Sequence, residues 1–225
     1  MKDLTRRSLL GGLAASVPIL GLARAEGAEG PAKGALAQHK NEEFYGADGK
    51  LDVAKAKQAY YELMEFHHFP VFPRLKTDEF WVLDFALGKF TEVGMAGIFY
   101  INNQRDNYLL HDIWLLPGQM IPEHRHVKVE NVAPKMEAWL VRNGLAYLYS
   151  EGEPTPGVAE RIPPTHREIA HARTEVVVRP GEVVRLEVAE KWHWMKAGPE
   201  GAIVTEVATY HDMGALRFAH PNIKL

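Results

Sequence analysis

The chain has 225 residues, of which 46% are apolar and 14 are prolines, and this composition suits one globular domain of ordinary core size. It contains no cysteine, which excludes disulfide bonds, thiolate chemistry and lipid anchoring through cysteine. Its formal charge of −3 at pH 7 becomes −6 without residues 1–25, which hold four basic residues and one acidic residue. An acidic chain of this kind lacks the basic face that nucleic acid or an anionic membrane requires of a partner.

Residues 1–25 predict an export signal. Arg6 and Arg7 form a twin-arginine pair, a modestly apolar run follows, and residues 23–25 read Ala-Arg-Ala, a small-residue cleavage site. The positive charge of Arg24 directly before the cut is typical of the twin-arginine route. The apolar run is too short and too rich in glycine to span a bilayer. We therefore expect the twin-arginine export machinery as a partner and a mature protein that is periplasmic or secreted and not bound to a membrane.

Residues 26–50 are rich in glycine, alanine and charge without a sustained period, which predicts a linker or extended arm. A folded domain is expected over residues 51–225. Asp52 is a good helix N-cap, and a helix is expected within residues 51–69, closed by Pro70. Apolar residues recur on one face of this helix at helical spacing, namely Val53, Ala56, Tyr60, Leu63 and Met64.

From residue 80 onward the chain changes to short runs rich in aromatic and β-branched residues, each bounded by turn signals. Pro117-Gly118 and Pro180-Gly181 are such turns, and Asn143-Gly144 predicts a tight hairpin because both residues tolerate positive φ. About ten strands and no second helical run predict an antiparallel sandwich or barrel. The expected strands are 80–87, 93–101, 108–115, 120–127, 135–142, 145–150, 174–179, 183–188, 192–197 and 202–210.

Two histidines one residue apart, His124 and His126, lie in one of these expected strands. Side chains at positions i and i+2 of a strand point to the same face, so this pair directs two imidazoles at one point. Such a pair is half of a metal site. A carboxylate ligand is expected downstream, and both Glu130 and Glu137 are candidates.

The stretch from Gly118 to Gly144 resembles the first motif of the cupin superfamily, G(x)5HxH(x)3-4E(x)6G. Six residues lie between Glu137 and Gly144, as the motif requires, whereas no glycine stands at the matching distance from Glu130. This favours Glu137 and implies about seven additional residues in the loop after His126. A late histidine, the fourth ligand of the motif pair, is expected at His193, although no Pro-x-Gly precedes it.

Four segments together resemble the cupin sugar isomerases related to D-lyxose ketol-isomerase: PEHRH, KMEAW, WHWMKAGPEGAIVTEVATYHD and RFAHP. The resemblance covers roughly residues 110–220, and the chain departs from it in the loop after His126 and in His211-Asp212, where Asn-Asp is expected. It implies an all-β cupin double-stranded β-helix, a jelly-roll barrel with an N-terminal amphipathic helix. It also implies a homodimer and a free sugar such as D-lyxose as the substrate. The implied ligands of a divalent metal, in the first place Mn²⁺, are His124, His126, Glu137 and His193.

Residue types alone would also suit Zn²⁺, Fe²⁺ or Co²⁺. Isomerisation of an aldose to a ketose through an enediol(ate) requires a base, and Glu206 is expected to serve, with a pKa raised by burial among apolar neighbours. Alternatively, Glu206 forms a structural salt bridge. Lys135 lies on the face of Glu137 and is expected either to contact a substrate oxygen or to be a solvated strand end. Trp139 either stacks on the sugar or belongs to the core.

Residues after the last expected strand are hypothesised to contact substrate at the barrel mouth, namely His211, Asp212 and Arg217. His111, by contrast, is interpreted as a hydrogen-bonded histidine of the sheet. Two other functions remain open: a metal-dependent oxygenase on the same barrel, and a carbohydrate-binding cupin without catalytic activity. A second carboxylate beside the metal distinguishes the isomerase, because proton transfer needs it and oxygen activation does not.

Overall fold

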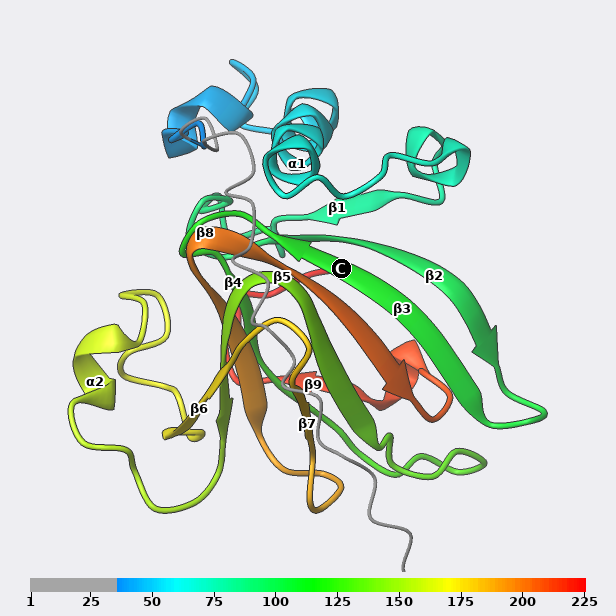
Figure 1. Cartoon of the computed structure of the whole chain (residues 1–225). Coiled ribbons are helices and arrows are strands. Elements are labelled where there is room, and N and C mark those ends of the chain that lie inside the picture. The colour runs from blue at the N-terminus through cyan, green and yellow to red at the C-terminus, as the bar shows by residue number, and fades with distance from the viewer. Residues whose placement is uncertain (1–35) are drawn as a thin grey trace, which may run out of the picture. The chain divides into compact units, whose positions relative to one another are not determined.

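The computed structural model describes residues 36–225, and the helices and strands of this part form a β-rich domain (Figure 1). The predicted signal peptide and the first ten residues of the predicted arm lie outside the described residues. No helix within 36–225 has both the length and the apolar character needed to cross a bilayer. The elements in chain order are η1 (Asn41–Phe44), α1 (Val53–Phe66), η2 (Pro73–Lys76), β1 (Trp81–Leu83), β2 (Met95–Asn103), β3 (Tyr108–Leu115), β4 (Met120–His126), β5 (Glu137–Ser150), α2 (Val158–Arg161), β6 (Thr174–Val178), β7 (Val183–Arg185), β8 (His193–Ala208), η3 (Met213–Ala215) and β9 (Leu216–Phe218).

The predicted front helix is α1. The side chain of Asp52 caps it by accepting a hydrogen bond from the backbone N–H of Lys55, at 3.0 Å. Val53, expected on the apolar face, is 44% exposed at the first position of the helix. Upstream of the helix, η1 lies within the segment predicted as an arm, and its Phe44 is buried. The buried residues of the helix are Ala56, Ala59, Tyr60, Leu63 and Met64.

The strands pair antiparallel in one curled sheet with the order β1-β2-β3-β8-β4-β9, and β5 pairs with β6, β7 and β8. Because β8 pairs with β3, β4 and β5, it lies at the centre of this pairing (Figure 1). The sheet curls around its interior as a half-barrel, and the predicted all-β cupin fold with a leading helix is confirmed.

The hairpin predicted at Asn143-Gly144 is wrong, because β5 runs through both residues as one strand. Gly144 has φ +73°, and this positive φ bends the strand instead of reversing it. A Cβ at Gly144 would lie 2.1 Å from the carbonyl oxygen of Gly201, so no larger residue fits the bend.

The long strand β8 bends at the same place. Gly144 pairs with Ala202, but Ala146 pairs with Ala197, so residues 198–201 form a corner that β5 does not match. The sequence predicted two strands separated by a turn here, whereas the structure has one strand that changes direction. Because of the corner, the N-terminal half of β8 pairs with β4 and the C-terminal half pairs with β3.

Two hydrophobic cores lie on the two faces of this sheet. The helix core lies between α1 and the outer face, and among its largest members are Tyr60, Leu63, Phe80 and Trp114. The interior core fills the barrel and contains the functional cavity, and its large members include Trp139, Tyr149 and Trp194.

Candidate active site

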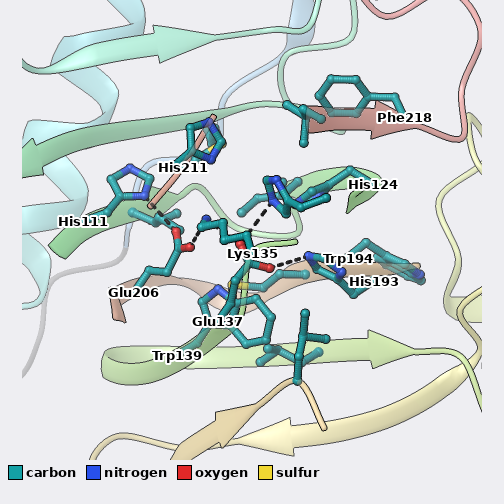
Figure 2. Close-up of a pocket in the computed structure, with 18 of the residues that line it drawn as sticks. His111, His124, Lys135, Glu137, Trp139, His193, Trp194, Glu206, His211 and Phe218 are labelled. Atoms are coloured by element: carbon teal, nitrogen blue, oxygen red, sulfur yellow. Dashed lines mark hydrogen bonds and ion pairs between the residues drawn. The ribbon is translucent and has the colours of Figure 1, made fainter. Parts of the chain in front are cut away.

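A cavity of about 360 Å³ opens into the barrel interior, with polar side chains grouped among apolar walls (Figure 2). Strands β3, β4, β5 and β8 supply most of the polar groups, and the residue that follows β8 by three positions, His211, supplies another. The titratable side chains that line the cavity are His111, His124, His126, Lys135, Glu137, Tyr149, His193, Glu206 and His211.

Three histidines and one glutamate meet in this cavity. His124 and His126 come from β4, Glu137 is the first residue of β5, and His193 is the first residue of β8. One nitrogen or oxygen atom from each of the four lies within 4.8 Å of the others. Glu130, the alternative carboxylate, is exposed in the loop between β4 and β5.

The backbone orients two of these imidazoles. The Nδ1 of His124 lies 2.9 Å from the carbonyl oxygen of Pro122, and the Nδ1 of His193 lies 2.9 Å from that of Lys191. Since a carbonyl only accepts, each Nδ1 donates a proton, and Nε2 is the ring nitrogen that is left to bind an ion. A second hydrogen bond of this kind is the usual way in which a metal-binding histidine is held.

Several buried nitrogen and oxygen atoms of this group have no hydrogen-bond partner within residues 36–225: both ring nitrogens of His126, the Nε2 of His193 and one oxygen of Glu137. These atoms lie close together without forming hydrogen bonds: the Nε2 of His193 is 2.8 Å from Glu137 Oε2, and the Nε2 of His126 is 3.2 Å from Glu137 Oε1. Buried polar atoms without partners are costly, and a divalent cation would satisfy the ligating atoms among them at once. The donor set therefore fits a metal with nitrogen and oxygen ligands.

The protonation of His124 and Glu137 also suits a cation. Burial lowers the pKa of His193, but the Glu137 carboxylate raises it by more, so an ion would displace a proton from that ring. Burial lowers the pKa of His124 well below its ordinary value, so the imidazole is in its neutral, metal-binding form. Burial by itself raises the pKa of Glu137, but the ammonium of Lys135 and the neighbouring His126 and His193 lower it well below the usual range. Glu137 is consequently a carboxylate.

Lys135 joins this carboxylate to a second one. Its Nζ lies 2.5 Å from Glu137 Oε1 and also forms an ion pair with Glu206 Oε1 (Figure 2). Lys135 is only 4% exposed, so the alternative of a solvated strand end is wrong. Burial alone lowers the pKa of Lys135, but the two carboxylates outweigh it and raise that pKa.

Glu206 is buried as expected, but its pKa is lowered, not raised. Burial and the negative charge of Glu137 act to raise it, whereas the ammonium of Lys135 and a hydrogen bond from His111 lower it by more. The expectation of a raised pKa took only apolar neighbours into account and missed the cation on the adjacent strand.

His111, interpreted from the sequence as a bonded histidine of the sheet, lines the cavity and contacts Glu206. Its Nδ1 lies 3.0 Å from Glu206 Oε2. The two residues are 95 positions apart and face each other because β3 and β8 pair in the register that sets His111 opposite Glu206. No local pattern in the sequence carries that register.

The residues hypothesised to contact substrate lie in different places. Trp139 lines the cavity, with its ring centroid 5.6 Å from that of His193. His211 also lines it, 5.3 Å from the ring of His126, and burial together with Lys135 and His126 lowers the pKa of His211 to about 3. Asp212 caps η3 by accepting from the N–H of Gly214, at 2.7 Å.

Arg217 is exposed, and its guanidinium donates to the carbonyl oxygens of Gly214 and Leu216, each at 2.8 Å. Neither Asp212 nor Arg217 lines the cavity. Aromatic residues from β1, β2 and β9 do line it without having been predicted, namely Trp81, Phe99 and Phe218.

Known proteins similar to this chain are sugar isomerases. The chain is 34% identical over 175 residues to a D-lyxose/D-mannose isomerase of Thermosediminibacter oceani, with 78% of this chain and 94% of the relative covered. It is 36% identical over 143 residues to a D-lyxose ketol-isomerase of a Thermofilum species, with 64% and 78% covered. A D-lyxose ketol-isomerase of Cohnella laeviribosi is 38% identical over 128 residues, with 57% and 69% covered. No protein-family model matches the chain.

Solved structures similar to this one include two L-ribose isomerases. The enzyme of Cellulomonas parahominis superposes with a TM-score of 0.60 at 14% identity, over 76% of this chain and 92% of that one. The enzyme of Acinetobacter sp. DL28 superposes with a TM-score of 0.59 at 15% identity, over 75% and 91%. At such low identity these similarities show a shared fold.

Proposed function

The chain belongs to the D-lyxose ketol-isomerase family, and on this premise we propose that it is a divalent-metal-dependent aldose–ketose isomerase that acts on a free sugar such as D-lyxose. The observation that carries the proposal is the pair of buried carboxylates, Glu137 and Glu206, that share the ammonium of Lys135. One carboxylate belongs to the metal-binding group, and the other is close enough to serve as a base beside it.

The metal-binding residues of the proposal are His124, His126, Glu137 and His193. Mn²⁺ is the ion that we propose, and Zn²⁺, Fe²⁺ and Co²⁺ also accept imidazole and carboxylate ligands. When bound, a divalent ion supplies electrophilic stabilisation of the negative charge that develops on the sugar oxygens.

Glu206 performs the proton transfer. Its carboxylate removes the proton from C2 of the open-chain aldose, which leaves an enediol(ate), and returns this proton to C1. The hydroxyl proton of O2 moves to O1 in the same conversion, so that O1 becomes the hydroxyl and O2 the carbonyl of the ketose. In the resting site the ammonium of Lys135 keeps Glu206 a weak base, in line with its lowered pKa. A sugar oxygen that draws the ammonium of Lys135 toward itself would remove this restraint and raise the basicity of Glu206 as the substrate binds.

The cavity walls position the sugar and keep water from the reacting carbons. We assign sugar contacts to His211, whose neutral ring adjoins the metal-binding group, and to Trp139, whose indole lies against His193. Among the alternative functions, an oxygenase or a carbohydrate-binding protein has no need for a second carboxylate bridged by a lysine to a metal ligand. The arrangement therefore favours the isomerase.

The test is a panel of pentoses and hexoses read for aldose–ketose exchange, together with elemental analysis of the purified protein. We expect D-lyxose to be converted, a stoichiometric divalent metal, and loss of conversion on chelation. Glu206→Gln should lower kcat by roughly 10³-fold and leave the metal content unchanged. Turnover of the Glu206→Gln variant at the wild-type rate would refute the assignment of the base, and an apo-protein of full activity would refute the metal.

We also propose that the chain is exported by the twin-arginine machinery and acts as a homodimer. The paired arginines of residues 1–25 support export, and large exposed apolar side chains on two strands support association, Val183 at 64% and Val207 at 56%. Substitution of Arg6 and Arg7 by two lysines should retain the protein in the cytoplasm. Light scattering should give twice the chain mass; a monomer would contradict the dimer.

A further inference from the structure

We infer that His111 is a positioning residue that fixes the orientation of Glu206, an inference that rests on the proposed role of Glu206 as the base. The His111 side chain is about 5% exposed and lies on the cavity face of β3. Its Nδ1 lies 3.0 Å from Glu206 Oε2. Because a carboxylate only accepts, Nδ1 is the donor of this hydrogen bond.

The contacts of Glu206 divide between two residues. Oε1 is bound by Lys135, and Oε2 is bound by His111. Lys135 also contacts Glu137, and in the proposed reaction it turns toward the sugar. His111 is then the contact of Glu206 that persists through the reaction, so the direction in which the carboxylate points depends on the imidazole.

The ring of His111 is held in place by its surroundings. It lies nearly parallel to the ring of Phe99, with centroids 4.4 Å apart at 29°, and to the ring of Trp81, at 5.4 Å and 28°. Gly97 makes room for this packing, because a Cβ there would lie 2.4 Å from His111 Nε2 and 2.5 Å from Trp81. A ring packed on this scale has little freedom to turn.

The other ring nitrogen offers no alternative donor. His111 Nε2 is buried, faces Gly97 and has no hydrogen-bond partner in residues 36–225. The imidazole therefore acts on the site through Nδ1 alone. Two substitutions distinguish the roles of the two ring nitrogens. The side-chain amide introduced by His111→Asn would lie near the position of Nδ1, and the amide introduced by His111→Gln would lie near the position of Nε2.

The first test compares His111→Asn with His111→Gln, two polar variants of similar size. We expect His111→Asn to keep kcat within about 5-fold of the wild type, and His111→Gln to lower kcat roughly 100-fold with a change in KM below about 3-fold. Bound metal and melting temperature are measured for both. Equal kcat values for the two variants, or a higher value for His111→Gln, would overturn the inference.

The second test is chemical rescue of His111→Ala and applies even if the glutamine variant does not fold. Added imidazole, which has an N–H, should raise the kcat of the variant at least about 10-fold. The compound 1-methylimidazole, which has no N–H, should leave this kcat unchanged. Both compounds bind metals, so this comparison removes that effect. Equal rescue by the two compounds, or none by either, would show that the hydrogen bond does not matter.

The third test separates this inference from the proposed function. If His111 acts through Glu206, then Glu206→Gln combined with His111→Gln should be no slower than Glu206→Gln alone. Additive losses would mean that His111 acts elsewhere and would overturn the inference while leaving the isomerase intact. Failure of the wild type to isomerise any sugar would refute the proposed function instead.

Discussion

The helix core and the interior core are buried to a similar degree, yet they treat polar atoms differently. In the helix core, Gln119 is fully buried and its oxygen and nitrogen both have partners. Its Oε1 accepts from the hydroxyl of Tyr60 at 2.7 Å and from the N–H of Leu116 at 2.9 Å, and its Nε2 donates to the carbonyl of Phe90 at 2.5 Å.

In the interior core, nitrogens of His126 and His193 and an oxygen of Glu137 lack hydrogen-bond partners among the described residues. These atoms surround one cavity. In the helix core, by contrast, the indole N–H of Trp114 is the buried polar group without a hydrogen-bond partner among residues 36–225. Unsatisfied burial is destabilising, so its concentration around a cavity indicates atoms that a metal or a substrate would satisfy. Stability and function are thus assigned to opposite faces of one sheet.

The largest effect should come from Glu137→Gln, which removes the negative charge of the metal-binding group and keeps its shape. We expect metal affinity to fall at least about 100-fold and kcat/KM by about 10³-fold or more, because the neutral amide is a poor ligand beside three imidazoles. Calorimetric titration with Mn²⁺ measures the affinity directly.

The matched control is Glu123→Gln on the opposite face of β4. Glu123 is also fully buried, but it accepts from the backbone N–H groups of His171 and Ala172, at 2.8 and 2.6 Å. This variant should lose stability and keep the affinity for Mn²⁺ within about 10-fold. Equal affinity losses in both variants would break the contrast between the two faces.

Leu63→Ala in the helix core should show the reverse pattern. The Leu63 side chain is fully buried, and its removal leaves a cavity, so unfolding should become easier by about 2 to 5 kcal/mol. Urea denaturation gives this number, and kcat should stay within about 2-fold of the wild type. Val53→Ala, on the exposed first position of the same helix, should change stability by less than about 0.5 kcal/mol. A catalytic defect in Leu63→Ala would show that the two cores are coupled.

Gln119→Leu should cost about 1 to 3 kcal/mol of folding stability, because it leaves the Tyr60 hydroxyl, the Leu116 N–H and the Phe90 carbonyl without their partner. Addition of Tyr60→Phe should recover part of the loss, since it removes one of the unpaired groups. The comparison uses denaturant midpoints at constant pH. If the single variant is as stable as the wild type, the complete pairing of Gln119 has no energetic value.

A small, pH-dependent effect concerns His166, a buried histidine outside the cavity, whose Nε2 also has no hydrogen-bond partner among the described residues. Burial and the nearby His220 lower the pKa of His166 from 6.5 to about 4. Between these two pKa values the unfolded chain therefore binds a proton at this residue that the folded chain does not. His166 therefore lowers the free energy of unfolding as the pH falls through this range, by about 1 kcal/mol at a pH of about 5.5.

His166→Gln should reduce that fall, seen as a shallower loss of the denaturant midpoint from a pH of about 7 to about 5, and should leave Mn²⁺ affinity unchanged at neutral pH. An unchanged slope would assign the acid sensitivity to other groups. A loss of metal binding would mean that His166 belongs with the cavity after all.

Features that depend on local spacing could be predicted from the sequence. The one-residue gap between His124 and His126 places both side chains on one face of any strand, and the glycine at a motif distance from Glu137 distinguished it from Glu130. The N-cap and the apolar stripe of α1 are equally local, and the helix lies where they predict it.

Features that depend on register between distant strands could not be predicted. The partnership of His111 with Glu206 and the lowered pKa of Glu206 both follow from the pairing of β3, β5 and β8, which no single segment encodes. The same limit explains why the hairpin predicted at Asn143-Gly144 is wrong, because a positive φ at the glycine suits a hairpin or a bend equally well. The bend was selected by the corner of the partner strand.

The corner of β8 at residues 198–201 has a consequence for how this site can vary. One continuous strand carries both His193 and Glu206, and the corner sets the number of residues between them. Because side chains alternate, deletion of a single corner residue would rotate one half of the strand by half a turn and send either the imidazole or the carboxylate out of the lumen. The corner thus constrains the number of residues between His193, the proposed metal ligand, and Glu206, the proposed base: only a change that keeps both side chains in the lumen is tolerated.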